Sequence, residues 1–204
     1  MGCRSVNLLY DPANRKANRD PRLRSSVYFQ GDIFLKYLNR PFGGNTATKF
    51  GLKKYIRDDV SDQGINPGAP GGQDFYVIRY ADVLLMRAEA LTESGQLSEV
   101  YPLLDQIRVR AGMPTVSEVN GTDLSQEELL DLVKLERRVE LAFEGLRFFD
   151  VKRWGEVEEA YARAAADPVG PYNPEYRGRK SEVFAIPLSE LDANPNLVQN
   201  PAWD

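Results

Sequence analysis

The stretch that decides the fold runs from residue 79 to residue 112 and reads RYADVLLMRAEALTESGQLSEVYPLLDQIRVRAG. Its apolar residues recur every three or four positions, which is the period of a helix that buries one face. Gly95 and Gly112 end the two halves, because glycine enters the left-handed conformation without a Cβ penalty. The pattern predicts two helices joined by a short turn. The residues expected to face the core are Tyr80, Val83, Leu84, Ala88 and Leu91 in the first helix and Val100, Leu103, Leu104, Ile107 and Ala111 in the second.

Two further helical stretches follow. The first begins at Ser125-Gln126-Glu127-Glu128, a capping box in which the first and last residues satisfy each other's backbone N–H groups. The second runs from Leu146 to about Ala166, with a break at Gly155. The apolar residues expected to face the core in the first of these are Leu129, Leu132, Leu135, Val139 and Phe143. Short connections between successive helices indicate antiparallel hairpins.

The first hairpin has the spacing of a tetratricopeptide repeat. Ala88 fits the small position of that repeat, and Gly95, Val100, Leu104 and Ile107 fall at its offsets, although its large aromatic residues are missing. The same spacing also fits two amphipathic helices that simply pack together. We expect a mainly α fold of tetratricopeptide-like helical hairpins.

The N-terminal part differs in composition. Residues 1–75 carry 12 Lys and Arg against 7 Asp and no Glu, whereas the rest of the chain carries 14 against 23 acidic residues. Two runs rich in Gly, Pro and Asn, at 40–45 and 66–72, favour loops and short strands. We therefore expect an irregular, loop and short-strand segment over 1–78 and a helical region over 79–204.

Composition also excludes classes of function. The 204 residues carry a net charge of −4, so a chain-wide basic surface for nucleic acid is not expected. The sequence has no histidine, which removes Ser-His-Asp and Cys-His nucleophiles and His-ligated zinc. Its single cysteine, Cys3, cannot form an intrachain disulfide or build a cysteine metal site alone. We expect no cofactor, no metal and no nucleic acid partner.

Charged and large apolar side chains alternate densely over residues 136–154, ERRVELAFEGLRFFDVKRW. Such a helix cannot keep every charge in water, so we expect half-buried ion pairs, which suit the planar guanidinium of arginine. Neighbours three residues apart would join Glu144 to Arg147 and Asp150 to Arg153. The predicted structural ion-pair network comprises Glu89, Arg108, Arg110, Glu136, Arg137, Arg138, Glu140, Glu144, Arg147, Asp150 and Arg153.

The same acids also permit a catalytic interpretation. Glu136, Glu140 and Glu144 recur every four residues on one helix face, and two of them, such as Glu140 and Glu144, could act as general acid and base in glycoside hydrolysis. Regularly spaced acids that lie among an equal set of arginines more often form a structural ion-pair network than a catalytic pair. We therefore expect a structural role and no enzyme activity.

Four blocks in order along residues 75–204 carry a family resemblance. They are 79–90, RYADVLLMRAEA; 107–112, IRVRAG; 136–155, which contains the pattern Glu-Arg-Arg-x-Glu-Leu-x-x-Glu-Gly-x-Arg-Phe-x-Asp-x-x-Arg-Trp-Gly; and the ending 186–203, IPLSELDANPNLVQNPAW. These blocks resemble the C-terminal part of the SusD/RagB family of outer-membrane nutrient-binding lipoproteins.

The resemblance implies a function. Members of that family are mostly helical, with tetratricopeptide-like hairpins supporting loops that hold a glycan or peptide, and they are not enzymes. They are tethered to the cell surface by a lipidated N-terminal cysteine and sit as a lid over a SusC-like TonB-dependent transporter. The resemblance therefore implies capture of oligosaccharide, or another nutrient, at the outer membrane and delivery to such a transporter. Family chains are usually far longer, and Gly2-Cys3 resembles the lipoprotein cleavage junction without its preceding apolar segment.

Sugars present C–H faces to aromatic rings and hydroxyls to planar polar side chains, so a glycan site needs exposed aromatic residues on loops. Tyr28 and Tyr55 are aromatic candidates in the N-terminal part. The predicted glycan-binding residues are Tyr37, Phe42, Asn45, Tyr172 and Tyr176. The phenylalanines expected in the core instead are Phe34, Phe50, Phe75, Phe148 and Phe149.

A function of another class stays open: a helical-repeat scaffold that binds protein, here the transporter, without a surviving ligand site. Retention on a glycan, lost on Tyr37→Ala or Phe42→Ala, would separate the two.

Overall fold

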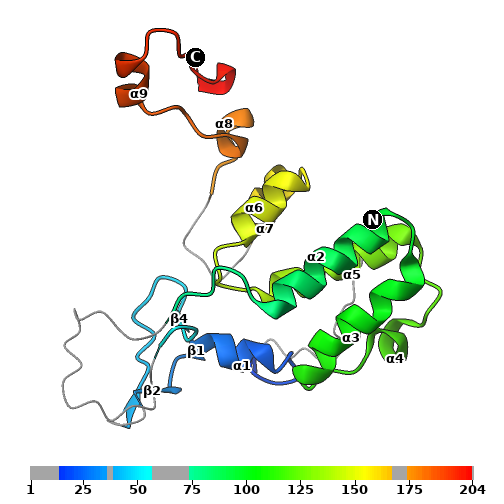
Figure 1. Cartoon of the computed structure of the whole chain (residues 1–204). Coiled ribbons are helices and arrows are strands. Elements are labelled where there is room, and N and C mark those ends of the chain that lie inside the picture. Colours follow the sequence, from blue (N-terminus) through cyan, green and yellow to red (C-terminus); the bar gives the residue numbers. More distant parts are fainter. Residues whose placement is uncertain (1–13, 36–38, 57–73, 167–173, 204) are drawn as a thin grey trace. The chain divides into compact units, whose positions relative to one another are not determined.

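The computed structural model describes residues 14–35, 39–56, 74–166 and 174–203. It confirms a mainly α fold with a few short strands (Figure 1). The chain divides into two compact units, Met1–Leu146 and Arg147–Asp204. Within the described ranges, no helix is long and apolar enough to cross a membrane.

The three longest helices described in the first unit pack together and form its core. They are α2 (Tyr80–Glu93), α3 (Val100–Arg110) and α5 (Gln126–Glu140), and α2 packs against both of the others. A 3-10 helix, η2 (Leu97–Glu99), precedes α3, and the short α4 (Val116–Asn120) follows it. The helical hairpin predicted over residues 79–112 is therefore present as α2 and α3, and the tetratricopeptide-like architecture is confirmed (Figure 1).

Capping residues and a glycine set the helix ends. Gly95 follows α2 with a φ of 77°, the left-handed conformation expected of it. Ser125 begins α5 with the predicted capping box, in which its side chain accepts from the Glu128 N–H and the Glu128 carboxylate accepts from the Ser125 N–H. Thr115 and Glu118 form a second box at the start of α4, a helix that the apolar period did not indicate.

An apolar core fills the space among α2, α3 and α5. Leu85 and Leu129 are fully buried in it, and Leu104 is almost fully buried. Each such side chain stabilises the fold by roughly 1.5–3 kcal/mol relative to its exposed state. The rest of this apolar core consists of Leu84, Ala88, Val100, Tyr101, Leu103, Ile107, Val116, Val133 and Leu141.

The predicted inward faces of α2 and α5 are partly wrong. Tyr80 is 70% exposed and Phe143 is 54% exposed, and Val83 and Leu135 are also exposed. The buried positions include the predicted Leu84 and Ala88 in α2 and Leu129 in α5; the others are Ala81, Asp82, Leu85 and Thr92 in α2 and Val133, Glu136, Arg137 and Glu140 in α5. Apolar periodicity misplaces the face because both helices turn charged residues inward.

The N-terminal segment of the same unit holds a short helix, α1 (Arg22–Ser26), and two small antiparallel sheets. β1 (Val27–Phe29) pairs with β4 (Phe50–Leu52), and Tyr28 lies opposite Gly51 in that register. β2 (Ile33–Leu35) pairs with β3 (Arg40–Pro41) through an irregular register. These short strands were expected from the composition of this part of the chain.

The described residues of the second unit, 147–166 and 174–203, form four short helices and a 3-10 turn. They are α6 (Arg147–Arg153), α7 (Val157–Ala165), α8 (Arg179–Glu182), α9 (Leu188–Ala193) and η3 (Pro201–Trp203). The predicted break between α6 and α7 is present, since the glycine at 155 has a φ of 71°. The composition boundary near residue 78 lies inside the first unit, and the two-domain division drawn there stays a prediction.

Side-chain contacts hold the C-terminal signature together. The Gln199 side chain accepts from the Ile186 N–H at 2.9 Å and donates to the Ile186 carbonyl at 3.0 Å. The Trp203 indole donates to the Val183 carbonyl at 3.0 Å.

The prediction that Phe148 and Phe149 are buried is wrong, since they are 40% and 61% exposed.

Candidate functional site

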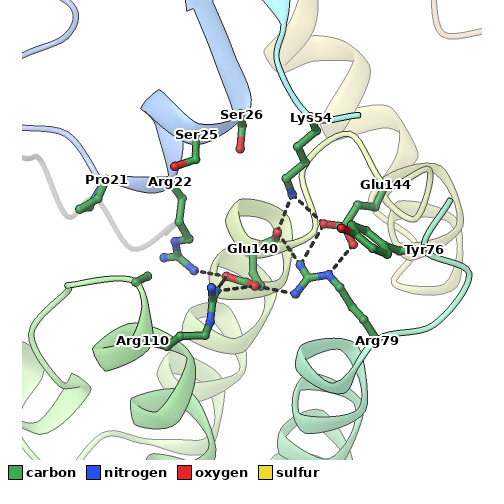
Figure 2. A pocket seen from close by; sticks show the side chains of 11 residues that line it. Pro21, Arg22, Ser25, Ser26, Lys54, Tyr76, Arg79, Arg110, Glu140 and Glu144 are labelled. Atoms are coloured by element: carbon green, nitrogen blue, oxygen red, sulfur yellow. Dashed lines mark hydrogen bonds and ion pairs between the residues drawn. The ribbon is translucent and has the colours of Figure 1, made fainter. Parts of the chain in front are cut away.

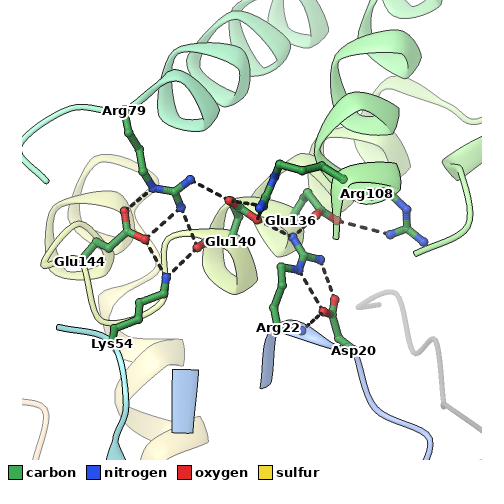
Figure 3. Close-up of polar contacts among 9 residues, drawn as sticks. Asp20, Arg22, Lys54, Arg79, Arg108, Glu136, Glu140 and Glu144 are labelled. Carbon is green, nitrogen blue, oxygen red and sulfur yellow. Dashed lines mark hydrogen bonds and ion pairs between the residues drawn. The ribbon is translucent and has the colours of Figure 1, made fainter. Parts of the chain in front are cut away.

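Three acids at the end of α5 form the centre of a buried ionic cluster. Glu136 and Glu140 lie one turn apart on α5, and Glu144 follows in the next turn; each is at most 5% exposed. Five basic residues and one further acid surround them (Figure 3). The ionic cluster comprises Asp20, Arg22, Lys54, Arg79, Arg108, Arg110, Glu136, Glu140 and Glu144.

Glu140 accepts from three arginines. Arg79 Nη1 donates to its Oε1 at 2.7 Å, and Arg22 Nη1 donates to its Oε2 at 3.0 Å. Arg110 Nη2 reaches both oxygens, at 2.7 and 2.8 Å. These donors come from α1, from the start of α2 and from the end of α3, so one carboxylate joins three elements of the unit (Figure 3).

Glu144 accepts a bidentate pair of hydrogen bonds from Arg79 and one further bond from Lys54. Arg79 donates through Nε to Oε2 at 2.7 Å and through Nη2 to Oε1 at 2.9 Å. Lys54 Nζ donates to Oε1 at 2.6 Å. Arg79 Nη2 and Lys54 Nζ also bond the Glu140 carbonyl, at 2.9 and 3.0 Å. A bidentate guanidinium–carboxylate pair is among the stronger and more directional polar contacts in proteins.

Arg22 connects the third acid to the N-terminal segment. It donates to Glu136 at 2.5 Å and to Asp20, which lies two residues before it. Arg108 Nη1 approaches Glu136 from α3 at 3.3 Å. The cluster therefore connects α1 and the segment after β4 to the helices.

The cations of the cluster lower the pKa values of Glu140 and Glu144. Burial alone would raise the pKa of the Glu140 carboxyl, but hydrogen bonds from Arg79 and Arg22 outweigh it and lower that pKa. For Glu144, burial is likewise outweighed by Arg79 and Lys54, and its pKa is lowered. The same pairings raise the pKa of Arg79 against its own burial. Glu140 and Glu144 are therefore ionised at neutral pH and face a charged Arg79.

A pocket of about 430 Å³ opens beside the cluster, within the first unit (Figure 2). This volume falls in the range of small-ligand sites. Its lining residues are Pro21, Arg22, Ser25, Ser26, Lys54, Tyr76, Arg79, Arg110, Ala111, Glu140 and Glu144.

Three aromatic rings lie together at the entry to α2. Tyr55 stacks on Phe75 with ring centroids 5.3 Å apart and contacts Tyr76 at 5.6 Å. Phe75 is 60% exposed and Tyr76 is 47% exposed, so the prediction that Phe75 lies in the core is wrong. Tyr76 lines the pocket, which therefore has one aromatic wall among its charged ones. No metal-binding group of acids, cysteines or histidines occurs in the part of the chain that the structure describes.

The structure places the predicted network residues in several surroundings. Arg137 forms a separate buried pair with Asp82 at 2.7 Å. In the second unit, Arg153 donates to Asp150, and the Arg147 guanidinium lies 5.6 Å from the Trp154 ring. Glu89 is half-buried on α2, and Arg138 is exposed on α5. Glu144 pairs with Arg79 and Lys54, where the sequence spacing had suggested Arg147.

Sequence reasoning missed five partners of the network, one of which, Arg79, lies in the first motif block. Arg22 and Lys54 lie in the loop-rich segment, far along the chain from the acids they bind, and Asp20 and Asp82 also carried no local signal. The one available hint was compositional, because residues 1–75 carry an excess of basic over acidic residues that the acidic helices can neutralise.

The predicted glycan-binding residues are scattered. Phe42 is half-buried, with its ring 6.2 Å from that of Tyr28, and Asn45 lies exposed on the following loop. Tyr176 donates to Glu182 at 2.5 Å, and this bond raises the pKa of Tyr176 to about 12. Tyr37 and Tyr172 lie outside the described residues. The roles of all five stay predictions.

Comparison with known proteins extends the motif resemblance to nearly the whole chain. SusD-like protein P38 of Formosa agariphila is 34% identical over 155 residues, which is 73% of this chain and 27% of that protein. A SusD superfamily protein from Bacteroides vulgatus superposes with a TM-score of 0.69 at 30% identity, covering 91% of this chain and 40% of its own. A laminarin binding SusD-like protein superposes at 0.62 with 34% identity, covering 89% and 35%.

The chain thus spans about a quarter of the length of its curated relatives and about two fifths of the solved structures. The sequence profile of the SusD family matches residues 7–203, which include all the motifs and the whole ionic cluster. This chain belongs to the SusD family.

Proposed function

We propose that this chain binds oligosaccharide without chemically altering it, at the surface of the outer membrane, and passes it to a SusC-like TonB-dependent transporter. The observation that carries the binding step is Tyr76, whose half-exposed ring forms a wall of the pocket beside the ionic cluster. An aromatic face next to guanidinium and ammonium donors is the combination that a sugar ring and its oxygens require.

Two further observations support binding of a glycan. A structural neighbour at 34% identity is a laminarin binding SusD-like protein. Phe75 and Tyr55 continue the aromatic surface from Tyr76 with stacked and tilted rings, which suits a chain of sugar units better than a single one. We assign additional contacts to the loop residues Phe42 and Asn45. Tyr176, in the second unit, is a separate candidate for a glycan contact.

The state of the acids favours binding over turnover. Glycoside hydrolysis needs one carboxylic acid that is protonated near neutral pH, with its pKa raised. The pKa values of Glu140 and Glu144 are lowered instead, because each accepts several hydrogen bonds from cations. Neither carboxyl can therefore donate a proton to a leaving group at neutral pH.

Affinity electrophoresis tests the binding step. The chain is run through gels containing laminarin, starch-type, plant and host polysaccharides, and retardation is compared among wild type, Tyr76→Ala and Phe42→Ala. We expect retardation on at least one glycan and its loss in Tyr76→Ala. Phe184→Ala is the matched control, since it removes an exposed ring from the second unit.

Absence of retardation on every glycan would overturn the proposal and leave the protein-binding scaffold as the function. Reducing-sugar release that is abolished by Glu144→Gln would overturn its non-enzymatic part. The delivery step is tested separately, by co-purification of this chain with a SusC-like transporter produced in the same cells.

A further inference from the structure

We infer that the pocket selects glycans that carry negative charge, through a carboxylate or a sulfate ester that sits among the side chains of Arg110, Lys54 and Arg79. This inference rests on the proposed function and names the chemical class of its ligand.

The first argument is the layering of charge in the pocket. The side chains of Glu140 and Glu144 are each 3% exposed, so the negative groups form the buried floor. The basic side chains are more accessible: 59% exposed for Arg110, 24% for Arg79 and 21% for Lys54. A ligand entering from solvent therefore meets cations before it meets carboxylates.

The second argument is the balance of charge among the lining residues. Four of them are cationic and two are anionic (Figure 2). Arg22 also pairs with the two further acids of the cluster, Asp20 and Glu136, and Arg108 approaches Glu136, so the cluster as a whole holds five cations and four acids. The pocket is thus locally positive in a chain whose net charge is −4. Fixed charges in a partly desolvated cleft act on a ligand more strongly than they would in water.

The third argument is the supply of hydrogen-bonding groups. Both oxygens of Glu140 and both oxygens of Glu144 already accept bonds from cations. Sugar hydroxyls that need an acceptor gain little from them.

Charged N–H groups of the pocket, in contrast, are still available to donate to a ligand. Arg110 contacts Glu140 only through Nη2, and Lys54 Nζ uses two of its three N–H bonds, counting partners within the described part of the chain. A pocket that is rich in spare charged donors and poor in acceptors fits an anionic group better than a hydroxyl.

The test compares binding to polysaccharides of different charge by isothermal titration with the full chain. The probes are laminarin as a neutral glucan, polygalacturonate as a carboxylated polymer and carrageenan as a sulfated one, with sodium sulfate alone as a fourth. We expect a charged polymer to bind at least about tenfold more tightly than laminarin, which corresponds to one charge-assisted hydrogen bond. The preferred polymer distinguishes the carboxylate from the sulfate, and weak binding of sulfate alone supports a site that needs the sugar as well.

Two variants assign the preference to the pocket. Arg110→Met should weaken binding of the charged polymer about tenfold, with Arg110→Lys restoring part of it. Arg87→Met is the matched control, because Arg87 is 63% exposed on α2 and pairs loosely with Glu99 at 3.7 Å. Circular dichroism confirms that each variant is folded.

Equal binding of laminarin and both charged polymers, or charged-polymer binding that Arg110→Met leaves unchanged, would overturn this inference while leaving glycan binding intact. Binding of sulfate alone as tight as that of the sulfated polymer would also overturn it, since the site would then recognise the ion. Binding of no polysaccharide at all would overturn the proposed function itself, and the inference with it.

Discussion

The two halves of α5 are buried by opposite means. Its N-terminal half places Leu129 and Val133 in an apolar core with Leu85 and Leu104. Its C-terminal half places Glu136 and Glu140 among arginines from three other elements. The apolar half joins helices that are neighbours along the chain, whereas the ionic half joins helices to the loop-rich segment. Charge pairs are directional, so they fix this segment at defined contacts, whereas apolar burial is non-directional.

The largest expected effect comes from the ionic half. Glu140→Gln removes the charge that three arginines share, and it leaves Arg79 and Arg22 without their full counter-charge. Breaking a buried pair from one side typically costs about 4 kcal/mol, so we expect a loss of that order in the free energy of unfolding by urea. Glu127→Gln, an exposed change at the start of the same helix, is the control. A loss below about 1 kcal/mol would show that the ionic half contributes no more than a surface pair.

Leu129→Ala probes the apolar half. Truncation of this fully buried side chain leaves a cavity among α2, α3 and α5, and we expect a loss of about 3 kcal/mol in the same experiment. If this loss is much smaller than that of an exposed leucine change such as Leu135→Ala, the core assignment is wrong.

Lowering the pH should reduce the stability contributed by the ionic half of α5 but not that of the apolar half. The folded-state pKa values of Glu140 and Glu144 are lowered, so the unfolded chain binds protons first as pH falls. Their contribution is complete above the unfolded pKa, near 4.5, and is lost as pH falls through the lower folded values. We therefore expect the difference between wild type and Glu140→Gln to shrink between neutral pH and pH of about 3, while that of Leu129→Ala stays nearly constant. Parallel pH profiles for both variants would contradict the account.

Helix capping gives a smaller effect. Ser125→Ala removes the acceptor for the Glu128 N–H at the start of the apolar half, and we expect a loss of about 1 kcal/mol in thermal or urea unfolding. Ser125→Asp, which keeps a capping oxygen, should retain most of the stability.

Local sequence signals predicted the elements well, for physical reasons visible at particular residues. Gly95 and the capping box at Ser125 act within a few residues of chain, so the ends of α2 and α5 could be read directly. The buried face of α5 could not, because hydropathy treats Glu136 and Glu140 as outward-facing. Their burial becomes favourable through contacts with arginines far away along the chain, such as Arg22, which lies 114 residues from Glu136.

The site was predictable only in part for the same reason. Glu140, Glu144 and Arg110 were identified, but the pocket also needs Arg22, Arg79, Lys54 and Tyr76, which were not among the predicted site residues. Neither Lys54 nor Tyr76 stands in a local pattern that differs from those of other loop residues.

The most direct measurement of the central claim is the coupling energy between Arg79 and Glu144, from urea unfolding of Arg79→Met, Glu144→Gln and the double variant. The bidentate contact at 2.7 and 2.9 Å in a buried site predicts a coupling of about 2 kcal/mol. A coupling within about 0.5 kcal/mol of zero, as expected for independent sites, would contradict the claim that these ion pairs hold the unit together.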